Sequence, residues 1–283
     1  MTNSNEVHFK GKNFDFNLTE TPIIYSILNL TPDSFYDGGV NTSVDQVLDR
    51  IETEMGYGAK IFELGGKSSK PHFDDISPDE EWQRVEPYLK AIQKRFPNIV
   101  LAIDSNTNSV IERALQSGIQ IINDIDGFNS QTKLDLVQQY QPSVVTMFNG
   151  RNFDEQPTTL EDTMHSFFTD SINRLEHAGL QSENIVIDPG VGFSDRNTLE
   201  FDLIKMRYTK QMRQFGAPIM IAISQKSFAK RLFDAGSDER LIPTLLFEAY
   251  MTQLGGRIIR VHNVKETQEL IKTYQIFKDI LSD

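Results

Sequence analysis

The sequence predicts an α/β fold, a (β/α)8 TIM barrel in which eight parallel strands close into a cylinder and each strand is followed by a helix. Three observations support this prediction. Short apolar runs alternate with stretches of helical periodicity, nearly every run ends in polar residues, and 283 residues is a usual length for such a barrel. The runs begin at Ile23, Ile61, Val100, Ile121, Val144, Ile185, Ile219 and Ile258. A doubly wound sheet is the alternative, but it usually gathers its polar groups at one switch point.

A short β-hairpin is expected before the first strand. Residues 7–16 alternate between apolar and polar side chains and contain Gly11, where the chain can turn. This hairpin, within about residues 5–20, would close one end of the barrel. We expect residues 1–283 to form a single domain.

Helices are expected after the strands. Ser43 precedes a stretch in which apolar side chains recur on one helical face, as expected for a residue that caps a helix. A further helix is expected from Pro78 to Arg95, and another around residues 110–115.

The composition restricts the possible functions. No apolar run approaches the roughly 20 residues of a membrane span, and the N-terminus lacks the features of a signal peptide, so we expect a cytoplasmic protein without membrane partners. The absence of cysteine excludes disulfides and thiolate metal sites. A net charge of -12 argues against nucleic-acid binding, although a local basic cluster can still bind an anionic substrate.

Three loops carry more functional groups than a simple connection needs. Residues 29–39 combine turn-forming, polar and aromatic residues, and residues 65–71 combine glycines with polar side chains. The third loop, 188–193, begins with Asp188 at the end of an apolar strand and ends with Phe193, whose ring offers a flat apolar face. Taken alone, Asp188 is equally well explained as a residue that caps a turn or a helix.

Seven polar residues are expected to converge, because the carboxyl ends of barrel strands meet on one face. They are Asn29, Asp104, Asn123, Asp188, Lys226, Arg260 and His262. Each alone has an ordinary structural explanation, and their joint occurrence favours a site. The carboxylates and amide suit a flat heterocycle rich in N–H groups, whereas the cationic residues suit a phosphate or diphosphate with its cation. Together they suggest a transfer reaction in which diphosphate leaves.

Four motifs resemble those of dihydropteroate synthases. Asn-Leu-Thr-Pro-Asp-Ser-Phe with Asp-Gly-Gly at 29–39 is similar to the first loop of that family, and 65–71 is similar to its second loop. Asp-Pro-Gly-Val-Gly-Phe at 188–193 and Arg-Val-His at 260–262 resemble two further signatures. The resemblance implies a barrel enzyme, a homodimer, that uses Mg2+ and joins p-aminobenzoate to 6-hydroxymethyl-dihydropterin diphosphate, releasing diphosphate and dihydropteroate.

The resemblance also implies roles for individual residues. Catalytic roles fall to Asp33, Phe35, Asp37 and Lys226, with the first loop closing over the site. The pterin ring would be bound by Asp104, Asn123, Asp188 and Lys226, with Met147 and Phe193 on its faces. Arg260 and His262 would hold the diphosphate, and Asn29 would be a ligand of the metal. The p-aminobenzoate would lie against Ser69, Lys70, Pro71, Ser227 and Phe193.

Several positions depart from the family's usual residues, and they gather around the second substrate. In the second loop, Lys67, Ser69 and Lys70 stand where the family usually has Glu, Thr and Arg. Phe148-Asn149 stands in place of His-Met, and Gln225 in place of Arg. Ser194-Asp195 stands where Lys often follows the Gly-Phe. Two alternatives are therefore considered. A pterin-dependent methyltransferase would not need the first loop or the Arg-Val-His motif. A diverged paralogue that binds pterin with weak or no synthase activity would explain the departures.

Overall fold

Eight parallel strands form the barrel. The computed structural model of the protein describes residues 6–31, 43–67, 76–150, 159–193, 198–234, 236 and 239–281. Neighbouring strands follow the order β8-β7-β6-β5-β4-β3-β10-β9. Their bounds are β3 (Ile23–Asn29), β4 (Ala59–Gly65), β5 (Val100–Asp104), β6 (Ile121–Asp124), β7 (Ser143–Met147), β8 (Ile185–Asp188), β9 (Met220–Ile221) and β10 (Ile258–Val261). A parallel bridge between Ile187 and Ile219 joins the two ends of the sheet, so the predicted barrel is confirmed.

The seventh barrel strand, β9, is shorter than the sequence predicts. The expected strand runs from Ile219 to Ile223, but only two residues form a ladder with β10. On its other side, β8 ends at Asp188 and is followed by Pro189, which has no N–H to donate. The residues after Ile221 therefore lack a strand partner on that side and lead directly into the next loop.

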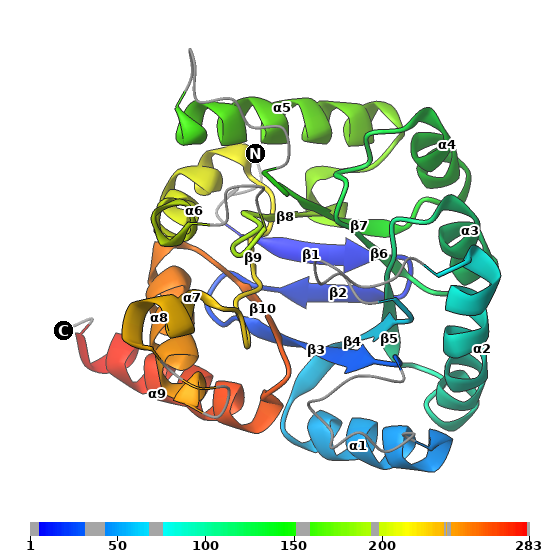
Figure 1. Ribbon diagram of the computed structural model, residues 1–283, viewed down its shortest axis with the longest axis horizontal. Helices are drawn as coiled ribbons and strands as arrows, with labels where there is room; N and C mark the ends of the chain where they lie inside the picture. Colours follow the sequence, from blue (N-terminus) through cyan, green and yellow to red (C-terminus); the bar gives the residue numbers. More distant parts are fainter. Residues whose placement is uncertain are drawn as a thin grey trace.

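The expected N-terminal hairpin closes one end of the barrel. It consists of β1 (His8–Gly11) and β2 (Phe14–Asn17), so the turn follows Gly11. Figure 1 shows both strands lying across the middle of the ring of barrel strands. Phe9 is fully buried among interior side chains of the barrel, and the carbonyl oxygen of Lys10 accepts a hydrogen bond from Ser143 Oγ at 2.7 Å. The hairpin thus forms the floor beneath the interior.

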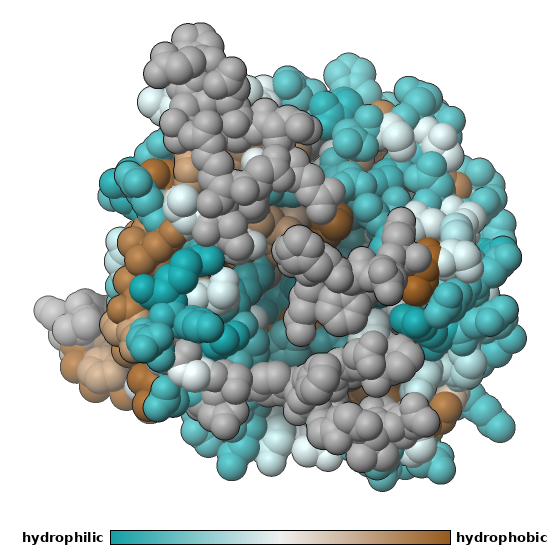
Figure 2. All heavy atoms as spheres, viewed as in Figure 1, coloured by the Kyte–Doolittle hydropathy of each residue, from teal (hydrophilic) through white to brown (hydrophobic). Residues whose placement is uncertain are grey.

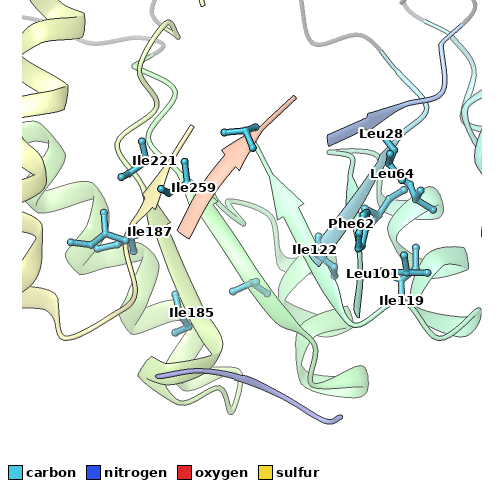
Figure 3. Close-up of a cluster of buried hydrophobic side chains, with 14 of the residues drawn as sticks. Leu28, Phe62, Leu64, Leu101, Ile119, Ile122, Ile185, Ile187, Ile221 and Ile259 are labelled. Atoms are coloured by element: carbon cyan, nitrogen blue, oxygen red, sulfur yellow. The ribbon is translucent and has the colours of Figure 1, made fainter. Parts of the chain in front are cut away.

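Alternate residues of the strands pack on opposite sides of the barrel wall. One set, including Tyr25, Ile61 and Val186, fills the interior together with the hairpin. The other set faces the helices, and Figure 3 labels several of these side chains, among them Phe62 and Ile187, distributed around the strands. Since burying one such side chain contributes about 1.5 to 3 kcal/mol, the two apolar layers stabilise the barrel and fix which strand positions face inward.

Helices surround the barrel, as the sequence predicts (Figure 1). They are α1 (Val44–Gly56), α2 (Pro78–Arg95), α3 (Asn108–Gln116), α4 (Gln131–Tyr140), α5 (Leu160–His177), α6 (Leu199–Met212), α7 (Phe228–Phe233), α8 (Leu241–Leu254) and α9 (Val264–Leu281), with 3-10 turns η2 (Ser182–Asn184) and η3 (Arg213–Phe215). Ser43 Oγ accepts a hydrogen bond from the backbone N–H of Gln46 at 3.2 Å, which confirms the predicted cap. In the described part of the chain, no helix has the length and apolar character needed to cross a membrane.

Candidate active site

The polar residues of the candidate site lie on the inner face of the barrel, next to its apolar interior. Side chains two residues apart point to the same side of a strand. Ile121 and Val186 belong to the interior cluster, so Asn123 and Asp188 also face inward. The same spacing places further residues on this face, namely Glu63, Asp104, Met147 and Arg260. Strand register then sets Asp104 beside Asn123 and Met147 beside Asp188.

Glu63, in the middle of β4, is the centre of this polar layer. Its fully buried carboxylate accepts hydrogen bonds from Tyr25 Oη, Asn123 Nδ2 and Arg260 Nε, each at 2.8 Å. Nη2 of Arg260 also donates to it. The buried charge is therefore fully paired, as a carboxylate in such a place requires. Because the amide nitrogen of Asn123 is engaged, its Oδ1 is left as an acceptor for a ligand.

Asp104 and Arg260 form the second ion pair of the layer. Nη2 of Arg260 donates to Asp104 Oδ2 at 2.9 Å. Burial, reinforced by the negative charge of Glu63, raises the pKa of Asp104 to about 7, although the guanidinium acts in the opposite direction. Burial by itself would lower the pKa of Arg260, but the charges of Glu63 and Asp104 outweigh it and raise that pKa above its ordinary value. Arg260 is therefore always charged, whereas Asp104 titrates near neutrality.

The loop after β8 folds tightly against the site. Asp188 Oδ1 accepts a hydrogen bond from the backbone N–H of Gly190 at 2.7 Å. Gly190 has a positive φ of 67°, and a Cβ there would collide with the carbonyl oxygen of Phe148, so only glycine fits. Burial raises the pKa of Asp188, while the neighbouring positive charge of Lys226 opposes this effect.

Lys226 connects this loop to the segment after β9. Its Nζ donates to the carbonyl oxygen of Val191 and lies 4.4 Å from the centre of the Phe193 ring. Burial lowers the pKa of Lys226 to about 8, although the charge of Asp188 acts against the shift. The ammonium group of Lys226, the ring of Phe193 and the carboxylate of Asp188 are thus neighbours. This combination of groups suits a flat polar heterocycle.

The outer rim of the site carries Asn29 and His262. Nδ2 of Asn29 lies 3.4 Å from Nε2 of His262, and Nδ1 of that ring lies 3.2 Å from Ser224 Oγ. Asn29 is exposed, so its amide can reach a ligand that is bound above the barrel. Figure 2 shows hydrophilic surface towards the centre of this view.

The part of the chain from residue 25 to residue 262 matches the family described as pterin binding enzyme. The chain belongs to this family. The earlier resemblance is thus confirmed over 25–262 by an independent comparison of the sequence.

Curated relatives of this pterin-binding enzyme are dihydropteroate synthases. The protein of Escherichia coli strain K12 is 32% identical over 260 residues, which cover 90% of this chain and 91% of the relative. The protein of Bacillus subtilis strain 168 is 33% identical over 257 residues, which cover 89% and 87%.

Solved structures agree with these sequence relationships. A dihydropteroate synthase from Clostridium difficile, crystallised in the presence of pteroic acid, is 30% identical and superimposes with a TM-score of 0.82 over 91% of this chain and 97% of that one. The Yersinia pestis dihydropteroate synthase in a sulfonamide drug complex is 28% identical, with a TM-score of 0.85 over 96% and 100%.

The structure brings together most of the predicted site residues of this pterin-binding enzyme. The polar layer and its rim contain Asn29, Asp104, Asn123, Met147, Asp188, Phe193, Lys226, Arg260 and His262. Ser227 lies at the start of α7, where its Oγ accepts a hydrogen bond from Nη1 of Arg231 at 3.0 Å. The remaining predicted residues, Asp33, Phe35, Asp37, Ser69, Lys70 and Pro71, lie outside the described residues. The roles of all these residues stay predictions.

Two buried charged residues of the site were missed by sequence reasoning. Glu63 lies within a strand and Lys205 within a helix, whereas the predicted site residues lie at strand ends and in loops. A charge inside an apolar strand is itself a signal, since a charged side chain is seldom fully buried without a partner. Lys205 offered no comparable signal, because lysine is ordinary in a surface helix.

Proposed function

We propose that this chain is a dihydropteroate synthase of folate biosynthesis. It condenses 6-hydroxymethyl-dihydropterin diphosphate with p-aminobenzoate and releases diphosphate and dihydropteroate. The observation that carries the proposal is the inward-facing layer of Asp104, Asn123 and Asp188 around Arg260, in a chain of the pterin-binding family. We expect the enzyme to act in the cytoplasm.

The pterin ring fits the polar layer by its hydrogen-bonding groups. The carboxylates of Asp104 and Asp188 accept hydrogen bonds from ring N–H groups, and Asn123 offers the amide oxygen that its bond to Glu63 leaves available. Met147, in register with Asp188, and Phe193 supply apolar surfaces for the two faces of the ring.

The diphosphate fits next to the ring, towards the rim. Nε and Nη2 of Arg260 are engaged by carboxylates, and among the described residues Nη1 has no recorded hydrogen bond, which leaves it for a phosphate oxygen. His262 lies beside Asn29 on the same rim, which makes it the second residue proposed to hold the leaving group.

The residues present are compatible with Mg2+ bound mainly through the substrate. Within the described residues no group of three or more His, Asp or Glu side chains could hold a metal ion. Mg2+ usually keeps several waters and binds phosphate oxygens with few protein ligands, so the exposed amide of Asn29 is a suitable single oxygen ligand. The ion would neutralise charge on the leaving diphosphate.

The reaction breaks the bond between the pterin methylene carbon and the diphosphate oxygen and forms a bond from that carbon to the amine nitrogen. The amine then loses one proton. Arg260 and His262 stabilise the negative charge of the leaving group, and the pterin ring delocalises the positive charge on the methylene carbon. Phe193 and Ser227 would contact the p-aminobenzoate, whose amine nitrogen attacks the methylene carbon.

A diphosphate-release assay with both substrates and Mg2+ tests the proposal. We expect diphosphate release that depends on p-aminobenzoate and a pteroate product visible by mass spectrometry. Tight pterin binding without release of diphosphate would instead identify the chain as a diverged pterin-binding paralogue.

We also propose a homodimer that forms through α8 and α9. Ile242, Leu246 and Tyr250 form a stripe at four-residue spacing on α8 with 70%, 67% and 47% of their surface exposed, and Phe277 on α9 is 59% exposed. Beside them is a groove of about 800 Å³, and hydrophobic residues gather along the left edge of the molecule in Figure 2. Apolar patches of this kind usually mark interfaces, and a two-fold axis would pair the stripe with itself. Leu246→Asp should shift the mass measured by light scattering from dimer to monomer.

A further inference from the structure

Helix α6 presents two buried charged side chains to the loop after β8. Asp202 and Lys205 are 2% and 0% exposed, respectively. A buried charge is costly unless hydrogen bonds and opposite charges compensate for it. Both residues are therefore bound into their surroundings, and each contacts the loop after β8, which belongs to the candidate pterin site.

Lys205 holds two carbonyl groups of this loop. Its Nζ donates to the carbonyl oxygen of Gly190 at 2.9 Å and to that of Phe193. The same ammonium group lies 5.2 Å from the centre of the Phe148 ring, where the family usually has histidine. An aromatic face attracts an ammonium group, whereas a protonated histidine would repel it. Phe148 and Lys205 are thus chemically matched.

Asp202 holds the loop from the same helix. Its Oδ1 accepts a hydrogen bond from the backbone N–H of Gly192 at 2.6 Å, and Oδ2 accepts one from Arg231. Together the two side chains of α6 fix residues 190, 192 and 193. The Phe193 ring, which lies 4.4 Å from Nζ of Lys226, is held in place by these contacts.

We propose that Lys205 is a positioning residue of the pterin site, which holds Phe193 against the substrate through the Gly190 and Phe193 carbonyl groups and places a positive charge near Asp188. This inference rests on the proposed function, because it requires that the loop contacts the pterin. It adds a residue from a helix to a site that is otherwise built from barrel strands and the loops that follow them.

The charge of Lys205 also affects the ionisation of Asp188. Besides the N–H of Gly190, three cations act on this carboxyl group: Lys226 from the segment after β9, Arg260 from β10 and Lys205 from α6. Each stabilises the carboxylate, which is the form that accepts hydrogen bonds from the ring. Without the charge of Lys205, the pKa of Asp188 should be higher. As the pH is lowered, Asp188 should then be protonated sooner, and the acid side of the binding profile, its acid limb, should lie at higher pH.

Lys205→Met tests both effects, because it keeps the length of the stem and removes the ammonium group. Binding of 6-hydroxymethylpterin is measured by calorimetry between pH 5 and pH 8. We expect at least a roughly tenfold loss of affinity at pH 7, corresponding to about 1.4 kcal/mol, and an acid limb that moves to higher pH. Lys210→Met, an exposed lysine of the same helix, is the matched control and should leave the profile unchanged. Lys205→Arg should keep the acid limb in place and lose less affinity.

A double-mutant cycle with Phe193→Ala shows whether Lys205 acts through the ring. In that background the loss caused by Lys205→Met should become smaller. Equal losses in both backgrounds with an unmoved acid limb would assign Lys205 to stability alone and overturn the inference. If Lys205→Met does not fold, Lys205→Gln carries the same comparison, because its amide can still donate to one carbonyl but has no charge.

The inference and the proposed function fail in different ways. A parent enzyme that binds pterin and releases diphosphate, with a Lys205→Met variant that matches it at every pH, would remove only the inference. A parent that does not bind the pterin would remove both. A parent that binds pterin without turnover would remove the synthase activity, and the binding measurements would still decide the role of Lys205.

Discussion

Glu63 and Arg260 form an ion pair inside the barrel, although 197 positions separate them in the sequence. Nε of Arg260 lies 2.8 Å from Glu63 Oε1, and the Glu63 side chain is 1% exposed. The same arginine also donates to Asp104. The guanidinium proposed to bind the diphosphate is thus held by two carboxylates, and one of them is proposed to bind the pterin ring.

Glu63→Gln should change the pH dependence of pterin binding. The negative charge of Glu63 helps to raise the pKa of Asp104 to about 7, after the larger effect of burial. Without that charge the pKa of Asp104 falls, so the carboxylate needed for binding persists to lower pH. Calorimetry with 6-hydroxymethylpterin should show the acid limb of the binding profile at lower pH than in the parent.

Glu63→Gln should also lower the free energy of unfolding by about 3 kcal/mol, because it leaves the buried guanidinium of Arg260 with one charge partner fewer. Glu54→Gln is a matched control: Glu54 is also buried and accepts a hydrogen bond from Arg50 Nε at 2.8 Å, but it lies on α1. It should lose stability and keep the pH profile of pterin binding. An acid limb that stays in place in Glu63→Gln would mean that Asp104 does not control pterin binding.

Asp188→Asn should weaken pterin binding with little effect on the fold. The amide keeps the shape of the side chain, but it replaces a carboxylate that accepts from ring N–H groups. Losing one charge-assisted hydrogen bond in a buried site should cost about 2 to 4 kcal/mol, or roughly 30- to 700-fold in the dissociation constant. Thermal unfolding should change little, since burial already disfavours the charged form of Asp188. Asp135→Asn, exposed on α4, is the control, and an unchanged pterin affinity in Asp188→Asn would contradict the assignment.

The sequence predicted the barrel well because each strand is a separate apolar run followed by a polar residue. The convergence of Asp104 and Asp188 at one end of the barrel follows from that pattern alone. Glu63 was less accessible to such reasoning: β4 is buried on both faces, so the sequence does not say which of its alternating positions face inward. Lys205 depends on the packing of α6 against a loop, which is a tertiary contact that helical periodicity does not encode. The short length of β9 is also a tertiary effect, because its neighbour β8 ends at Asp188 and offers no further strand partner.

A third prediction concerns Gln225, which stands where the family usually has arginine. Its Nε2 donates to Asn263 Oδ1 at 3.0 Å, and its own carbonyl oxygen accepts a hydrogen bond from Arg240 Nη1 at 3.2 Å. Gln225→Arg combined with Lys70→Arg would restore a charge and a planar donor group for an anionic aromatic amine. The Michaelis constant for p-aminobenzoate should fall about tenfold, corresponding to about 1.4 kcal/mol, with little change for the pterin substrate.

Gln211→Arg adds the same charge at an exposed position of α6 and controls for a general effect of net charge. It should leave both Michaelis constants unchanged. The idea that divergence is localised to the second substrate would have to be abandoned if the double variant bound p-aminobenzoate no better than the parent, or changed the pterin constant equally.

The fourth prediction concerns Glu248, which lies on the buried face of α8, away from the residues assigned to the substrates. Its side chain is fully buried, and among the described residues neither carboxylate oxygen has a hydrogen-bond partner of normal geometry. Burial raises the pKa of Glu248 to about 8, with the hydroxyl of Thr267 acting in the opposite direction. The folded protein therefore holds this residue as a neutral acid at neutral pH.

This raised pKa should make the folded state less stable as pH increases. In the unfolded chain the carboxyl group releases its proton near its ordinary pKa of 4.5, whereas in the folded protein it keeps the proton up to about pH 8. Between these values the folded state binds the extra proton, so the free energy of unfolding falls with rising pH, by on the order of 3 kcal/mol from pH 5 to pH 7.5. Glu248→Gln removes the titrating group and should abolish this part of the slope in urea denaturation measured across that range. Glu112→Gln makes the same chemical change at an exposed position of α3 and should leave the slope unchanged. If Glu248→Gln retained the slope of the parent, Glu248 would have to be ionised in the folded protein, with a compensating partner inside the fold.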